Sequence, residues 1–130
     1  MIPPPIALAL TLCEKAVVEE GTKNLTLVNT FTTMFMEHFP SLPQRFALYA
    51  ALTDGLGDAT IELVLTHLET DHEIRFLQMP VRFLDRLSEV RILYRLNGII
   101  FPQPGRYQFS LFVDGDWIAQ RRFQLQERGQ

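Results

Sequence analysis

Cysteine is nearly absent from this sequence: Cys13 is the single one among 130 residues. A lone thiol cannot close a disulfide within the chain, and it offers a zinc ion at most one sulfur ligand. The composition therefore excludes a disulfide scaffold, and it favours a reducing compartment, the cytoplasm. No neighbouring residue in the sequence indicates a base that would activate the thiol, so we expect Cys13 to be buried and inert.

Positive charge is also scarce. The chain has 12 Lys and Arg residues against 15 Asp and Glu residues, which gives a formal net charge of -3. Arg121-Arg122 is the only adjacent basic pair, and on a strand two neighbouring side chains point to opposite faces of the sheet. Because sequence-independent nucleic-acid binding depends on clustered positive charge, we expect no nucleic-acid partner.

Long hydrophobic runs are missing as well. No apolar run reaches the roughly 18 residues of a membrane-spanning helix, so we do not expect a membrane partner. The apolar start, residues 1–12, lacks a positively charged first region, and Pro3-Pro4-Pro5 interrupts it. These features argue against an export signal and again favour the cytoplasm.

Motifs of catalysis and cofactor binding are absent too. The sequence contains no Gly-x-Ser-x-Gly elbow, phosphate-binding loop or Gly-rich dinucleotide motif. Its three histidines, His38, His67 and His72, lack the spacing of a helical or cysteine-assisted metal site. We therefore predict a non-enzymatic protein without a cofactor, and we assign no catalytic, cofactor-binding or metal-binding residue.

What the sequence does contain is a regular rhythm of short apolar runs and turns. Apolar residues make up 47% of the chain and recur at every second position, which is the period of a strand and not of a helix. We therefore predict one all-β domain over residues 1–130, a single antiparallel β-sandwich of about eight strands, immunoglobulin-like or C2-like. The expected strands cover residues 7–19, 24–33, 45–52, 59–68, 73–83, 89–96, 106–113 and 117–126.

Three prolines interrupt this rhythm in two different places. Pro40 and Pro43 lie in residues 34–44, which we expect to be irregular, with at most one helical turn over residues 34–38. Pro80 lies inside the expected strand 73–83. Because proline cannot donate to a neighbouring strand, the second half of residues 73–83 is predicted to form an edge or a bulge.

The most legible turn is Asp114-Gly115, a strong hairpin signal. A two-residue turn would place Phe112 opposite Trp117, whereas a three-residue turn would pair Val113 with Trp117 and Tyr107 with Phe123. The second register buries more aromatic area on one face, so we favour it together with a bulge near Gly115. Tyr107 itself opens the expected strand 106–113, where immunoglobulin-like sandwiches carry a tyrosine whose hydroxyl bonds back to the upstream backbone.

The turns also carry acidic residues. If the strands run up and down, five aspartates fall at one end of the sandwich, namely Asp54, Asp58, Asp85, Asp114 and Asp116. Loop carboxylates at one end of a C2-like sandwich bind calcium and lipid, which is the first alternative function. The same residues are also ordinary turn formers. The His38 loop and the His72 turn would lie together at the other end.

Apolar residues on the outer faces indicate binding. Trp117 is a candidate stacking platform for a small molecule or a glycan, which is the second alternative function. Further apolar residues fall on nominally outer faces, and together they would form a surface for a protein partner or a homo-oligomer: Val64, Leu68, Leu93, Phe112 and Ile118. Our main prediction is a protein-interaction or assembly module.

Two segments, residues 12–31 and 101–115, resemble a bacterial family of short uncharacterised β-rich proteins, known as a domain of unknown function. The shared features are a Leu-Cys-Asp-like first strand, a Gly-Lys turn, a strand ending in Phe, and a Pro-Gly-x-Tyr strand leading into a hairpin. Here Glu14 replaces the expected Asp, and no Asp follows Phe31. The resemblance implies a bacterial, cytosolic, β-rich domain, and it implies no activity, cofactor or binding residue.

Overall fold

The computed structural model describes residues 3–129, and within them the chain folds into nine strands and no helix. The prediction of an all-β sandwich is confirmed; Met1, Ile2 and Gln130 of the expected domain lie outside the described residues. The strands are β1 (Ile6–Val18), β2 (Leu25–Thr30), β3 (Thr33–Met36), β4 (Gln44–Thr53), β5 (Gly57–His67), β6 (His72–Phe83), β7 (Val90–Ile99), β8 (Gly105–Val113) and β9 (Asp116–Glu127).

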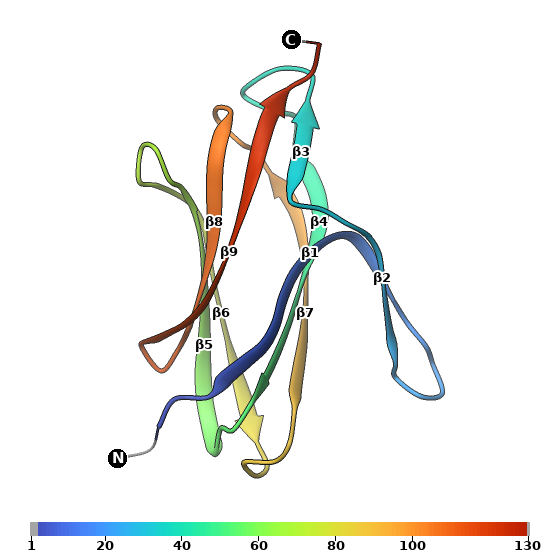
Figure 1. The fold of residues 1–130 in the computed structure, drawn as a ribbon, viewed down its shortest axis with the longest axis vertical. Helices are drawn as coiled ribbons and strands as arrows, with labels where there is room; N and C mark the ends of the chain where they lie inside the picture. Colours follow the sequence, from blue (N-terminus) through green and yellow to red (C-terminus); the bar gives the residue numbers. More distant parts are fainter. Residues whose placement is uncertain (1–2, 130) are drawn as a thin grey trace.

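The strands form two layers (Figure 1). One sheet has the order β2-β1-β4-β7 and the other has the order β3-β9-β8-β5-β6. The strand that contains Pro80, β6, lies at a sheet edge as predicted. All strand pairs run antiparallel except β3 and β9, which are parallel, so the prediction of a purely antiparallel sandwich is wrong at this one pair.

The strand β3 is the ninth strand, and the sequence did not indicate it. It replaces the helical turn that we considered for residues 34–38. It pairs with β9 from Thr33 opposite Gln124 to Met36 opposite Glu127. Backbone hydrogen bonds at the two ends of this pairing run from Gln124 N to Thr32 O at 2.9 Å and from Arg128 N to Met36 O at 2.7 Å. The side chain of Met36 is buried and closes one end of the core. A strand of four residues is too short to show an alternating pattern by itself.

The core lies between the two sheets and is rich in aromatic rings. Tyr107, Phe109 and Leu111 are all buried on the inner face of β8. The rings of Phe109 and Phe123 stack at a centroid distance of 5.7 Å, and Phe46 packs edge-on to Phe109 at 6.2 Å. These contacts join the two layers, because Phe46 belongs to β4 and the other rings belong to β8 and β9.

The register of the β8–β9 hairpin combines both expected alternatives. Asp114 and Gly115 both have positive φ, 49° and 86°, as a two-residue type I′ turn requires, and Phe112 lies opposite Trp117. Tyr107 nevertheless pairs with Phe123, because the register shifts beside Leu111 and Phe112. The predicted bulge therefore exists, but it lies after Trp117 and not at Gly115. Stacking of Phe112 on Trp117 at 6.3 Å accompanies the two-residue turn.

Candidate functional site

The five aspartates lie in or beside the β4–β5, β6–β7 and β8–β9 connections, at one end of the sandwich. Asp54 faces Arg86 at 3.5 Å, and Asp85 accepts hydrogen bonds from the backbone N–H groups of Leu87 and Ser88. Asp114 accepts from the backbone N–H of Thr60 at 2.9 Å. The Asp85 contacts are those of a turn former, whereas Asp54 and Asp114 each contact a residue of another segment. Within residues 3–129 no three His, Cys, Asp or Glu side chains come together as a metal site.

The histidines lie at the opposite end, and only His67 is buried. Its Nδ1 is 2.7 Å from the Thr70 hydroxyl and its Nε2 is 3.1 Å from the Pro104 carbonyl oxygen. The ring packs edge-on against Tyr107 at 4.7 Å. Both ring nitrogens thus have partners that tie the β5–β6 turn to the β7–β8 connection, which is a structural role.

Tyr107 forms the corner that its position predicted. Its hydroxyl donates a hydrogen bond of 2.6 Å to the carbonyl oxygen of Gln103, four residues upstream. Burial raises the pKa of the Tyr107 hydroxyl, the hydrogen bond to Gln103 lowers it, and the carboxylate of Glu69 raises it further. The net direction is upward, so the hydroxyl stays protonated and continues to donate.

Tyr94, on the inner side of β7, is buried without such a bond. Its hydroxyl finds no hydrogen-bond partner among the described residues. Burial raises the pKa of Tyr94 from 10.0 to about 12. The folded state therefore holds a neutral phenol that the unfolded chain would ionise at a lower pH.

We expect Tyr94→Phe to maintain or raise the free energy of unfolding at neutral pH, by up to about 1 kcal/mol, because it removes an unpaired buried hydroxyl. In the parent chain the higher folded pKa makes stability fall as pH rises from about 10 towards about 12, and Tyr94→Phe should reduce this loss. Urea unfolding at neutral and alkaline pH measures both effects.

Tyr107→Phe is the contrasting variant, because it deprives the Gln103 carbonyl of its donor. It should lower the free energy of unfolding by about 1 kcal/mol at neutral pH. Equal losses for the two tyrosine variants at neutral pH would contradict this account of both hydroxyls.

Cys13 is buried, as expected, and burial raises the pKa of its thiol. It lies on the outer face of the four-stranded sheet, opposite Ala47 of β4. A buried thiol with a raised pKa is mostly protonated at neutral pH and is a poor nucleophile.

Trp117 is 58% exposed at the start of β9, so its ring is available for stacking. One side of it packs near Phe112, and its indole N–H donates to the Ala119 carbonyl oxygen at 3.2 Å. Among the other outward apolar residues, Phe112 joins it, but Leu93 and Ile118 do not. Leu93 lies on β7 in the other sheet, and Ile118 packs against the core.

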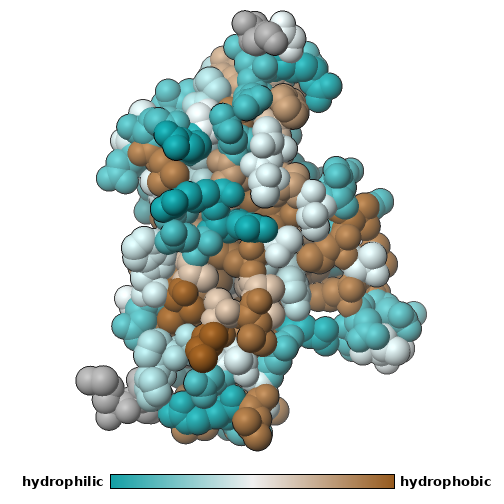
Figure 2. Space-filling view, viewed as in Figure 1, coloured by the Kyte–Doolittle hydropathy of each residue, from teal (hydrophilic) through white to brown (hydrophobic). Residues whose placement is uncertain are grey.

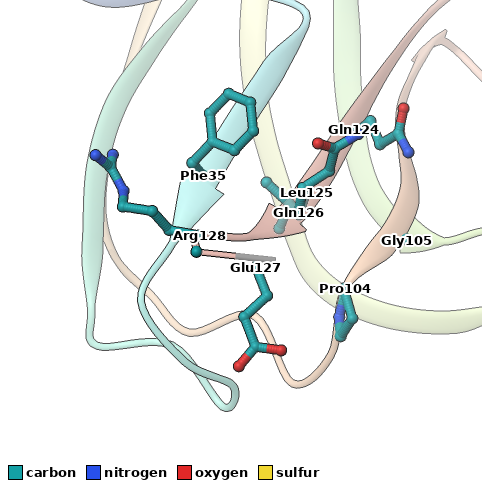
Figure 3. Close-up of a pocket in the computed structure, with 9 residues that line it drawn as sticks. Phe35, Pro104, Gly105, Gln124, Leu125, Gln126, Glu127 and Arg128 are labelled. Atoms are coloured by element: carbon teal, nitrogen blue, oxygen red, sulfur yellow. The ribbon is translucent and has the colours of Figure 1, made fainter.

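A shallow groove of about 730 Å³ follows the C-terminal end of β9 (Figure 3). Phe35 of β3, a residue that is 52% exposed, borders it on one side, and Pro104 and Gly105 border it on the other. The amide side chains of Gln124 and Gln126 project from the strand between them. These groups can offer hydrogen bonds and an apolar ring, and sequence reasoning missed the groove because it depends on the unpredicted strand β3.

A second feature that the sequence did not predict is a projecting hairpin, which we call the β1–β2 arm (residues 13–30). The pairing of β1 with β4 ends at Cys13 opposite Ala47, whereas β1 continues to pair with β2 as far as Val18 and Leu25. In Figure 1, β1 curves over at this point and the arm stands away from the two layers. Its polar turn is closed by a hydrogen bond from Glu19 N to Asn24 O at 2.8 Å.

The arm exposes apolar side chains on both of its faces. Val17 is 52% exposed, and Val18, on the opposite face, is also exposed. Leu25, Leu27 and Val28 on β2 are only half-buried. Figure 2 shows this projection as apolar along its length and hydrophilic at its tip. Since the arm lies outside the sandwich, the core does not cover these groups.

The strand β2 also differs from the other three sheet edges. Natural edge strands are usually protected by charges, proline or short length. Each of the others has such a device: β6 contains Pro80, β3 has four residues, and the guanidinium of Arg75 contacts the carbonyl oxygens of Asn97 and Gly98 on β7 at 3.4 Å. The sequence of β2, LTLVNT, contains neither charge nor proline. Its free edge is therefore open to a further strand.

Comparison with known proteins adds a family and a fold. A family model described as "Family of unknown function (DUF6941)" matches residues 8–126, and no curated protein matches. One similar solved structure is the alkylpurine DNA glycosylase AlkC of Pseudomonas fluorescens bound to DNA containing an abasic site analog, with 14% identity and a TM-score of 0.51. The match covers 73% of this chain and 27% of that one, so this chain spans about a quarter of its length.

Another is an immunoglobulin-like protein of Pseudomonas aeruginosa, with 10% identity, a TM-score of 0.43, and coverage of 96% of this chain and 98% of that one. At these identities the similarity concerns the fold alone. In addition, residues 3–129 contain no helix of the length and apolar character that crossing a membrane requires.

Proposed function

The chain belongs to the DUF6941 family, and we propose that it is a non-enzymatic protein-interaction module of the bacterial cytoplasm that takes up an extended strand of a partner protein on the edge of β2. The observation that carries this proposal is the β1–β2 arm: an apolar, unprotected edge strand placed outside the sandwich. Free backbone N–H and C=O groups of an edge strand select an extended polypeptide, and neighbouring apolar side chains add affinity.

Two further features support a location in the bacterial cytoplasm. The single cysteine is a free, buried thiol, which fits a reducing compartment. The resemblance of residues 12–31 and 101–115 to a bacterial family supports a bacterial source.

The test uses Val17→Lys, which places a charge on the exposed face of the arm and should leave the fold intact because Val17 is 52% exposed. Leu87→Lys is the matched control, because Leu87 is 94% exposed in the β6–β7 connection, away from the arm. The chain and both variants are purified from the host cell, and bound proteins are identified by mass spectrometry. We expect one partner to be retained by the parent chain and Leu87→Lys, and lost by Val17→Lys.

Hydrogen exchange with the identified partner then locates the contact. Binding should protect the amides of Leu25–Thr30. If the partner is a second copy of the chain, the same protection should rise with protein concentration. Retention of the partner by Val17→Lys, or protection confined to other strands, would rule out strand addition at β2.

A further inference from the structure

The curvature of β1 also creates a recess on the outer face of the four-stranded sheet. It has a volume of about 390 Å³, within the range of small-molecule sites. Its floor includes Ala47, whose small, buried side chain leaves room above the sheet. Three cations line it, Lys15, Arg45 and Arg95, and each comes from a different strand.

Strand register explains why these cations meet. Cys13 of β1, Ala47 of β4 and Arg95 of β7 lie side by side in one row across the sheet. Side chains two residues apart share a face, so Lys15 and Arg45 project from the same face as this row. Adjacent strands lie about 5 Å apart, so the backbones of β1 and β7, which carry the outer two of the three cationic side chains, are roughly 10 Å apart.

In the part of the chain that the structure describes, the three cations form no ion pair within 4.0 Å. Five other arginines each lie within 4.0 Å of a carboxylate: Arg82, Arg86, Arg91, Arg106 and Arg128. No ion pair among residues 3–129 includes Lys15, Arg45 or Arg95.

The one carboxylate that lines the recess does not neutralise them. Glu14 accepts a hydrogen bond of 3.1 Å from the side-chain amide of Asn29 on the β1–β2 arm. The recess therefore combines three positive charges and one negative charge, in a chain whose formal net charge is -3.

We propose that this recess binds a small, multiply charged oxyanion whose phosphoryl or carboxylate groups are held by Lys15, Arg45 and Arg95. Guanidinium groups bind both kinds of oxyanion through paired N–H donors, and an ammonium adds a point charge. Asn97 also lines the recess and offers an amide donor. The spacing across three strands fits an anion with two or more charged groups better than one with a single charge. This site does not depend on strand addition at β2.

The test is calorimetric titration of the purified chain with pyrophosphate, citrate and acetate at matched ionic strength. Pyrophosphate and citrate carry several charges on phosphoryl and carboxylate groups, respectively, and acetate carries one charge. We expect one binding site with a Kd between about 10 µM and about 1 mM for at least one of the two polyanions, and no binding of acetate. The polyanion with the lower Kd identifies whether the recess prefers phosphoryl or carboxylate groups. Binding should weaken as salt rises.

Four variants locate the site. Arg45→Gln and Arg95→Gln should each weaken binding about tenfold, because each removes a charge-assisted hydrogen-bond donor. Glu14→Gln should tighten it about threefold, because it removes the one negative charge. Arg82→Gln is the control, since Arg82 lies on β6 in the other sheet, and its affinity should stay within about twofold of the parent.

Circular dichroism and the melting temperature establish that each variant is folded. If either arginine variant fails to fold, a fifth variant, Lys15→Gln, should weaken binding because it removes a positive charge, whereas Glu14→Gln should strengthen it. Absence of binding of both polyanions at about 10 mM overturns the proposal. Equal weakening by Arg82→Gln and Arg95→Gln also overturns it, because it would indicate attraction by net charge without a defined recess.

Discussion

Replacing Gly105 by alanine is expected to lower the free energy of unfolding by about 3 kcal/mol, through positive-φ strain and the loss of neighbouring hydrogen bonds. Gly105 has φ of +128°, where side chains are rarely tolerated. An added Cβ would lie 2.8 Å from Nε2 of His67 and would collide with the Glu69 carboxylate. The His67 ring is hydrogen-bonded to the Pro104 carbonyl oxygen, and the Glu69 carboxylate accepts a hydrogen bond from the backbone N–H of Arg106. The substitution therefore strains the backbone and displaces both contacts.

Urea unfolding measures this loss, and Gly21→Ala is the matched control. Gly21 lies in the turn of the β1–β2 arm, where an added Cβ would meet no atom within 4 Å and φ is not in the positive range. Its substitution should change the free energy of unfolding by no more than about 0.5 kcal/mol. A loss below about 1 kcal/mol for Gly105→Ala would show that the corner around Tyr107 can rearrange.

This corner is one of the features that the sequence predicts well. A glycine two residues before a tyrosine, at the start of an alternating strand, indicates both the tight backbone and the hydroxyl contact. The alternation of apolar residues in β4, β5 and β8 is equally readable in the sequence, because their inward side chains cover a two-layer core. Burial follows this alternation in β5, whereas in β4 and β8 outward residues such as Ala47 and Ser110 are buried as well.

The functional surfaces are different, because they depend on strand order. Lys15, Arg45 and Arg95 are far apart in the sequence, and they meet because β1, β4 and β7 are neighbours. The one pair of adjacent basic residues in the sequence is Arg121-Arg122, and this pair does not line the recess. The sequence therefore indicated no basic cluster, although the fold contains one.

The β1–β2 arm was hidden for a related reason. Residues 13–18, CEKAVV, do not alternate cleanly, which indicates a bend near residues 13–15 but does not reveal that β4 leaves β1 at Cys13. The parallel strand β3 was hidden because its pairing with β9 joins segments about ninety residues apart. Both are tertiary effects without a local signature.

The role of Gly55 also depends on a tertiary contact that the local sequence does not reveal. Its substitution is the second large effect that we expect. The sequence Asp54-Gly55-Leu56-Gly57-Asp58 predicts a turn, because glycine adopts positive φ easily. Asp54 and Gly57 have positive φ, at 63° and 79°. Gly55 serves another purpose. A Cβ there would lie 2.6 Å from two ring atoms of Phe83, which is itself fully buried. We expect Gly55→Ala to cost about 2 kcal/mol, because the ring must move within a packed core.

The double variant Gly55→Ala/Phe83→Leu distinguishes this cause from backbone strain. Phe83→Leu alone should cost about 1–2 kcal/mol through lost packing, and it removes the ring that the new methyl group would meet. If the collision is the cause, the two losses should be less than additive by about 1 kcal/mol. Additive losses in urea unfolding would instead place the cost of Gly55→Ala in the turn itself, and the close contact with Phe83 would then not explain why this position is glycine.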